Sequence, residues 1–390
     1  MKIEEFCLTG SGTTPSRKKP QYYEGGIIPW VKSGELRENI ITSTEEAVTD
    51  LALKETSLKL VPEGVILLAM YGATVGRLAI LGIQATINQA ICYIKPDNKI
   101  ADTRYVYHYL FYSVRSLIAR AQGGAQPNIN QGIIKNIEIL LPPLPEQQRI
   151  TAILDKADQL RQQRQRAIDR LDDLLQSVFL DMFGDPVTNP MGWEVKELWE
   201  LLSEKPGNGY FRKNSDYGDG IPIIWISDFI NKIVIDYSNL KRVKATEKDV
   251  KKYRVGYGDV LFCRSSLTPE GIGKASIVPK GQNSLALFEC HIIKCKLDSD
   301  LIKPEYFRIY SNLPFYRYEV IRQSKTSTMT TISQGGLTKT RVMVPPLEQQ
   351  EKFGDVFYKM IEFKENHLKE AKDLDTLFAS LQQRAFRGAL

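Results

Sequence analysis

The sequence contains two closely similar stretches, PPLPEQQRI at Pro142–Ile150 and PPLEQQEKF at Pro345–Phe353. Each precedes a long charged run in which apolar residues recur at alternating steps of three and four, the spacing of a heptad seam on a long helix. Proline cannot continue into a helix interior, so each stretch marks where a domain ends and a helix begins. The first stretch carries Pro145 and the second has no counterpart to it, which predicts junctions that differ by one residue.

The similarity extends over most of the chain. GVILL from Gly64 matches GDVLF from Gly258, Trp30 matches Trp225, and INQG from Ile129 matches ISQG from Ile332. The offset between matched positions drifts slowly, as small loop insertions produce in two diverged copies of one fold. The chain is therefore a tandem duplication. We expect domains at 1–145 and 185–345 and helices at 146–184 and 346–390.

Each copy contains short apolar runs bounded by Gly, Pro, Asn and Asp, which predict strands and turns. A helix is expected at 102–121 and its counterpart at 303–322, giving a mixed α/β (α+β) fold. The two long helices are expected to pack as an antiparallel coiled coil with pseudo-two-fold symmetry, because neither seam is stable alone. Its seam is predicted from Ile153, Leu160, Arg164, Leu171, Leu174, Val356, Phe363, His367, Leu374 and Leu377. The polar pair Arg164 and His367 either meets at mid-helix to fix the register or reaches solvent.

Composition narrows the class of protein. The 390 residues carry 52 Lys and Arg against 46 Asp and Glu, a net charge of +6 that suits nucleic acid without proving it. Five cysteines with no CxxC spacing fit free thiols in a reducing compartment. The apolar stretch from Gly64 to Ala85 contains Arg77, which argues against a membrane span. A cytoplasmic protein is expected.

Several stretches together resemble the specificity subunits of type I restriction-modification systems. They are IPWVKSGEL from Ile28, GVILLAMYGATVGRLAIL from Gly64, GDVLFCRSS from Gly258, and the two proline stretches with the residues before them. The resemblance covers essentially the whole chain. It implies two target recognition domains that each read one half of a bipartite, asymmetric double-stranded DNA site, with the helices acting as a spacer ruler.

The resemblance also implies a subunit with no catalytic residues and no cofactor of its own. Two methylation subunits would use S-adenosylmethionine, and restriction subunits would use ATP and Mg. Two other classes remain open from the residues alone: a free-standing enzyme acting on nucleic acid, and a basic coiled-coil scaffold that binds DNA without sequence preference.

Candidate DNA-binding residues come from polar and basic tracts beside the predicted strands, since base edges need forked donors and acceptors and phosphates need cations. The same tracts could equally be solvated loops. In the first copy they are Lys18, Lys19, Lys32, Ser33, Tyr71, Thr74, Arg77, Gln126, Asn128 and Asn130. In the second copy they are Lys213, Ser227, Arg264, Ser265, Ser266, Lys274, Lys325, Thr326 and Ser327.

Two further patterns have some features of metal sites. Cys290, His291 and Cys295 have ligand chemistry, but their predicted strand would send Cys290 and His291 to opposite faces. Asp185, Glu194 and Lys196 outline a nuclease only loosely. No metal site is predicted.

Overall fold

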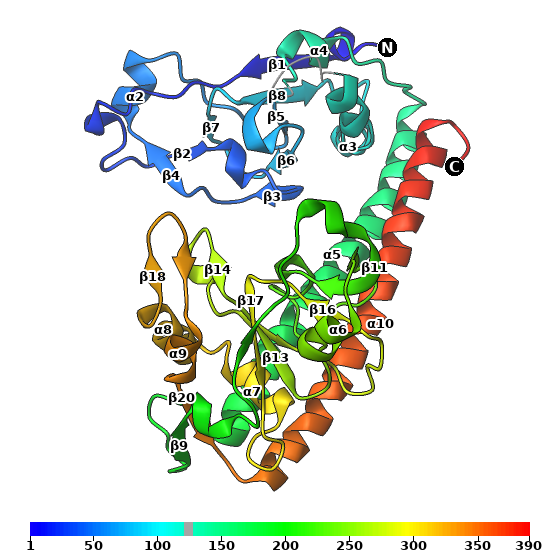
Figure 1. Ribbon diagram of the computed structural model, residues 1–390. Helices are drawn as coiled ribbons and strands as arrows, with labels where there is room; N and C mark the ends of the chain where they lie inside the picture. Colours follow the sequence, from blue (N-terminus) through cyan, green and yellow to red (C-terminus); the bar gives the residue numbers. More distant parts are fainter. Residues whose placement is uncertain (121–127) are drawn as a thin grey trace. The chain divides into compact units, whose positions relative to one another are not determined.

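The computed structural model describes residues 1–120 and 128–390 (Figure 1). The chain divides into two compact units. Unit 1 comprises 1–166 and 369–390, and unit 2 comprises 167–368. Each unit holds one globular domain and part of both long helices, α5 (Leu144–Phe183) and α10 (Leu347–Phe386).

Unit 1 is built on a five-stranded sheet of order β1-β8-β5-β6-β3 and a three-stranded sheet of order β4-β2-β7. One face of the larger sheet packs against α3. The opposite face packs against residues of the smaller sheet, Val31 in β2 and Ile87 in β7. The strands are β1 (Cys7–Ser11), β2 (Ile28–Val31), β3 (Asn39–Ile41), β4 (Glu46–Val48), β5 (Ile66–Ala69), β6 (Leu78–Leu81), β7 (Thr86–Ile87) and β8 (Ile91–Pro96). The shorter helices are α1 (Ile3–Phe6), α2 (Asp50–Glu55), α3 (Thr103–Arg120) and α4 (Gln131–Lys135).

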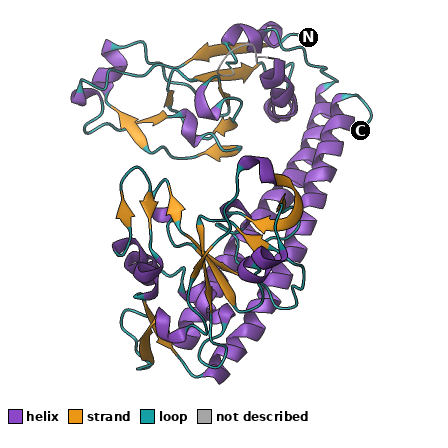
Figure 2. Cartoon of the chain, viewed as in Figure 1, coloured by secondary structure: helices purple, strands orange, loops and turns teal. Residues whose placement is uncertain are grey.

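Unit 2 has sheets of order β10-β17-β13-β15, β12-β11-β16, β14-β19-β18 and β20-β9, so strands and helices are mixed in both units (Figure 2). The strands are β9 (Glu194–Glu197), β10 (Gly207–Asn208), β11 (Tyr217–Ile224), β12 (Lys241–Val243), β13 (Asp259–Cys263), β14 (Ser265–Ser266), β15 (Ala275–Ile277), β16 (Leu287–Phe288), β17 (Ile292–Lys296), β18 (Lys325–Thr326), β19 (Thr330–Thr331) and β20 (Arg341–Val344). The shorter helices are α6 (Glu247–Tyr253), α7 (Pro304–Tyr310), α8 (Pro314–Arg322) and α9 (Gln334–Thr338).

The strand registers repeat between the units, which confirms the predicted mixed fold and its duplication. Leu67 pairs with Tyr93 across β5 and β8, and Leu261 pairs with Lys294 across β13 and β17. The apolar stretch from Gly64 forms β5 and β6, and among the described residues no helix is long and apolar enough to cross a membrane.

Two details of the predicted repeat are wrong. Trp30 lies in β2, whereas Trp225 precedes a short 3-10 turn, and the residue equivalent to Trp225 is Lys32. The backbone N–H of each donates to a carboxylate three residues later, Lys32 to Glu35 at 2.8 Å and Trp225 to Asp228 at 2.7 Å. The helix expected at 303–322 is split into α7 and α8, because the second begins at a proline that cannot continue the first.

The proline stretches hold the junctions through one buried glutamine each. Gln147 is fully buried; its amide oxygen accepts from Asp102 N–H at 2.8 Å, and its amide nitrogen donates to the carbonyls of Ile100 and Pro142 at 3.1 and 2.8 Å. Both this glutamine and its counterpart lie five residues after the first proline. The junctions are therefore equal in length, and the expected one-residue difference is wrong: Pro145 occupies the position of Glu348.

The second junction repeats this arrangement. Gln350 is fully buried, accepts from Lys303 N–H at 2.8 Å, and donates to the carbonyls of Leu301 and Pro345 at 3.3 and 2.7 Å. Tyr105 in unit 1 and Tyr306 in unit 2 add a second repeated bond, each hydroxyl donating to a carbonyl just before the prolines. Each helix is thereby fixed to its domain by the same set of contacts.

Within each unit, α5 and α10 pack in opposite directions. In unit 1, Arg161 lies 2.6 Å from Asp375 and Arg164 lies 2.7 Å from Glu370. In unit 2, Lys364 lies 2.6 Å from Asp172. Rising numbers on α5 pair with falling numbers on α10, which confirms the antiparallel coiled coil. The pair Arg161–Asp375 and the pair Lys364–Asp172 are equivalent positions of the two copies, 203 residues apart.

Part of the predicted seam is on the wrong face. Leu160, Leu174, Phe363 and Leu377 are 41, 50, 51 and 52% exposed. Leu171 is buried as predicted, and Ile153, Arg164, Val356, His367 and Leu374 are half-buried.

On α5, two buried residues lie one position after the predicted seam residues Ile153 and Leu174. Ile150 is followed by buried Leu154, and Leu171 by buried Leu175. Adjacent positions such as Leu174 and Leu175 are both apolar, so spacing alone could not select between the two phases.

Two further expectations concern local structure. Cys290 and His291 lie in a turn between β16 and β17 rather than in a strand, so the predicted alternation of their side chains does not apply; Cys295 is buried in β17. At the start of the chain, Met1 and Ile139 exchange backbone hydrogen bonds of 3.0 and 2.8 Å, a counterpart of the β9–β20 pairing in unit 2.

Candidate DNA interface

In unit 2, two predicted tracts that are distant in sequence form one small sheet. Ser265 pairs with Thr331, and Thr331 pairs in turn with Lys325 on its other side. The side chains of β18 are exposed, and Ser265 and Ser266 are half-buried. The strands β14 and β18 lie close together in Figure 1. Their hydroxyl side chains, with Lys325 at one edge and the 82% exposed Leu267 beside them, are called the hydroxyl surface below.

Unit 1 joins its corresponding tracts by an equivalent bond. Ile129 N–H donates to Met70 O at 2.8 Å, and in unit 2 Ile332 N–H donates to Arg264 O at 3.1 Å. This bond brings Asn128 next to the turn that begins after Tyr71. Both side chains are exposed, as is that of Arg77, while Thr74 is half-buried. Gln126 lies outside the described residues.

Some candidates have structural roles that compete with binding DNA. Asn130 caps α4 by accepting from Ile133 N–H at 2.9 Å, and Lys274 donates to Asn231 at 3.1 Å. The Arg264 guanidinium donates to the Cys290 carbonyl at 3.4 Å. These three side chains therefore also stabilise the local fold of the candidate interface.

The basic candidates also differ in their availability. Lys32 pairs with Glu45 at 2.9 Å and Glu46 at 3.0 Å, and its hydrogen bonds to these carboxylates raise its pKa. Lys19 donates to the Tyr22 hydroxyl at 2.8 Å and lies 3.5 Å from Glu55. Both therefore have local acidic partners.

The remaining candidates are mostly open to solvent. Lys18, Lys213, Ser227, Thr326 and Ser327 are exposed, and Ser33 is half-buried.

Sequence reasoning missed two features near these tracts. Arg17 stacks on Tyr23 at 4.3 Å from the ring centroid and pairs with Glu46 at 2.6 Å. Thr331 forms the centre of the small β14-β19-β18 sheet; it lies within the polar tract that begins at Gln323 but was not among the candidate residues.

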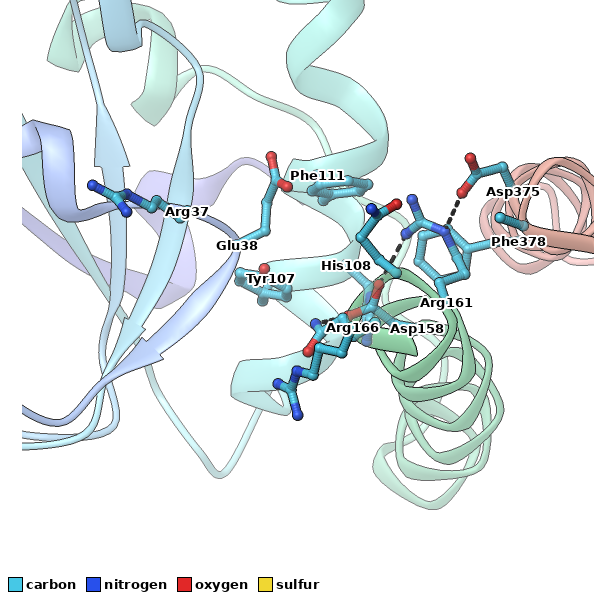
Figure 3. Close-up of a pocket in the computed structure, with 13 residues that line it drawn as sticks. Arg37, Glu38, Tyr107, His108, Phe111, Asp158, Arg161, Arg166, Asp375 and Phe378 are labelled. Carbon is cyan, nitrogen blue, oxygen red and sulfur yellow. Dashed lines mark hydrogen bonds and ion pairs between the residues drawn. The ribbon is translucent and has the colours of Figure 1, made fainter. Parts of the chain in front are cut away.

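A pocket of about 390 Å³ lies in unit 1 between α3 and the paired helices (Figure 3). Arg161 crosses it: the guanidinium donates to Asp158 at 2.9 Å and to Asp375 at 2.6 Å, and lies 4.5 Å from the Phe378 ring centroid. Tyr107 and His108, which belong to α3, also line this pocket. A pocket of about 250 Å³ in unit 2 contains Asp172, the equivalent of Asp375. The duplication thus repeats a hollow beside α5, although the unit 2 pocket is not lined by α10.

Comparison with known proteins identifies the family. The model of the type I restriction modification DNA specificity domain matches residues 1–170 and 190–373. The chain belongs to this family of specificity subunits. Recognition of DNA is the family's role, and the polar tracts described above carry different side chains at equivalent backbone positions in the two copies.

Individual relatives agree. The MjaIX specificity subunit of Methanocaldococcus jannaschii is 25% identical, with 100% of this chain and 92% of the relative covered. The EcoKI specificity subunit of Escherichia coli is 22% identical over 95% of this chain and 84% of its own. The crystal structure of the type I S subunit from M. genitalium has the same fold, with a TM-score of 0.57, 14% identity, and coverage of 99% of this chain and 95% of the other.

Proposed function

We propose that each unit reads one half of a bipartite, asymmetric double-stranded DNA site. The observation that carries the proposal is the repeated backbone bond that joins two polar tracts in each unit, with different side chains in the two copies. An identical frame that presents different donors and acceptors suits two different half-sites. In unit 2 the base-reading side chains are those of Ser265, Ser266, Lys325, Thr326 and Ser327.

In unit 1 the same role falls to Tyr71, Thr74, Arg77, Asn128 and Asn130, together with Gln126. Lys18, Lys19, Lys32 and Lys213 serve phosphates, which position a protein on the duplex without reading its sequence. For Lys19 and Lys32 to bind phosphate, their ion pairs with the neighbouring carboxylates must break, so that phosphate replaces the carboxylates as the partner.

The chain supplies specificity to partner enzymes and has no catalytic residues of its own. Two methylation subunits and the restriction subunits dock on it, and S-adenosylmethionine, ATP and Mg bind to those partners. The α5–α10 pair sets the gap between half-sites. The duplicated ion pairs on the two helices support this arrangement, because two copies of one partner require two equivalent surfaces. The assembly works in the cytoplasm.

Selection of bound sequences from a random DNA pool tests the proposal. The full chain, alone and with its methylation subunits, is expected to select two short blocks separated by a constant gap. Replacing Ser265 and Ser266 together by alanine should relax one block and leave the other unchanged, whereas Ser284→Ala, an exposed serine in a distant turn, should change neither. Selection of no preferred sequence, or equal relaxation of both blocks, would contradict it.

A further inference from the structure

A turn in unit 2 gathers three different metal-binding side chains. Glu289, Cys290 and His291 are consecutive, and the turn is closed by Ile292 N–H donating to Glu289 O at 3.1 Å. One donor atom from each of the three side chains lies within 4.8 Å of the others. Across 1–120 and 128–390, no other group of three or more His, Cys, Asp or Glu side chains comes together so closely.

The carboxylate in this group is deeply buried. Glu289 is only 3% exposed, and its Oε2 accepts from His291 N–H at 2.9 Å and lies 2.9 Å from His291 Nδ1. Burying a carboxylate is costly unless a positive charge or several donors balance it. The imidazole provides that charge only when it is protonated.

We propose that Glu289, Cys290 and His291 bind a divalent transition-metal ion, with zinc as the best fit and water in the fourth position. Oxygen, nitrogen and sulfur ligands are those zinc takes in proteins. Its bond lengths in tetrahedral geometry place sulfur and nitrogen about 3.5 Å apart and nitrogen and oxygen about 3.3 Å apart. Cys290 Sγ lies 3.5 Å from His291 Nδ1, which matches the zinc geometry. Glu289 Oε2 lies 2.9 Å from the same nitrogen, a hydrogen-bond distance that would lengthen by about 0.4 Å when the ion replaces the proton. Cys290 binds as thiolate and releases its proton to solvent.

The first copy shows that the turn does not need these side chains. Its equivalent residues are Asn88, Gln89 and Ala90, and Ile91 N–H donates to Asn88 O at 3.1 Å, the same bond as in unit 2. Asn88 Oδ1 accepts from Ala90 N–H at 3.2 Å, as Glu289 Oε2 does from His291 N–H at 2.9 Å, so a neutral amide is enough to hold this turn. The turn therefore does not need the negative charge of Glu289, the thiol of Cys290 or the imidazole of His291.

The turn is directly attached to the candidate interface. Arg264 N–H donates to His291 O at 2.8 Å, and Arg264 immediately precedes β14 of the hydroxyl surface. An ion that fixes the turn would thus order the segment that carries Ser265 and Ser266. This consequence rests on the proposed function, whereas the metal site itself does not.

Titration of the full chain with cobalt(II) alone tests the site, because cobalt replaces zinc and its bond to a thiolate absorbs light. We expect saturable uptake of one ion with thiolate-to-metal charge transfer, reversed by added zinc. Cys290→Ser should abolish this absorption. His291→Gln should weaken binding by about 100-fold or more, since loss of an outer-shell partner alone costs about 10–100-fold.

The matched control is Cys7→Ser, which removes a half-buried cysteine of unit 1 and should leave the absorption unchanged. His291 is 55% exposed at its side chain, so its replacement should not unfold the chain, and circular dichroism checks this. Absence of a saturable thiolate band in the unaltered chain, or its persistence in Cys290→Ser, would overturn the proposal. Neither result depends on DNA binding.

Discussion

Replacing Gln147 by methionine should loosen the junction between the unit 1 domain and α5. Methionine keeps the length and flexibility of the side chain but removes all three hydrogen bonds, to Asp102 N–H and to the carbonyls of Ile100 and Pro142. Each such bond contributes about 0.5–1.5 kcal/mol net, so the loss should be about 3 kcal/mol. For a unit of this size that corresponds to a fall of about 6–12 °C in the unfolding temperature.

The assay combines calorimetry with hydrogen exchange, because two units need not unfold together. The amide of Asp102 and the first turn of α3 should lose protection, while unit 2 stays unchanged. Gln148→Met is the matched control, since Gln148 is the next residue of the same helix and is exposed. If Gln147→Met costs no more than Gln148→Met, or if protection falls equally in both units, the buried glutamine does not hold the junction.

Two other perturbations test the packing of unit 1. Asp155 accepts from Arg104 and His108; although burial raises the pKa of Asp155, these bonds outweigh it and lower the pKa. The stability it adds is therefore present above the ordinary pKa of Asp, and is lost as pH falls through the lowered one. Asp155→Asn should cost about 1–2 kcal/mol at pH 7 after allowing for partial exposure, and should flatten acid unfolding followed by circular dichroism; an unchanged acid transition would contradict this. Gly76→Ala should lower the free energy of unfolding, measured in urea, by about 2–4 kcal/mol, because its φ is +81° and the new Cβ would lie 2.6 Å from a neighbouring side chain. The control Gly64→Ala has φ +80° but lies in open space, so it should lower this free energy by only about 1–2 kcal/mol. Equal losses in the two variants would refute the packing argument.

The duplication and the fold class could be predicted from sequence, because matched glycines and apolar runs report backbone requirements directly. Gly64 and Gly258 both adopt positive φ, which is why they mark the same strand entry. Tryptophan was a poorer guide. The two tryptophans differ by two residues in their backbone position: Trp30 is buried in β2, whereas Trp225 follows β11 and is half-buried.

The seam and the site show where sequence patterns cease to decide. Leu174 and Leu175 are equally apolar, but Leu175 is buried in the core of unit 2 and Leu174 is exposed. The tracts around Arg264 and Lys325 could be identified as polar, but their pairing through Thr331 depends on a long-range strand register that no local signal encodes. Cys290 was expected in a strand but lies in the turn before β17, which begins at Ile292.

The side-chain hydrogen bonds described for the two buried glutamines all go to main-chain atoms. Gln147 binds the N–H of an aspartate and Gln350 that of a lysine, residues of opposite charge at one position. Because these hydrogen bonds involve backbone atoms, they do not restrict which side chains the attached domain carries at these positions. Any domain that brings one N–H and two carbonyls past these helices could be grafted onto them, so new recognition specificities can be exchanged without redesigning the joint.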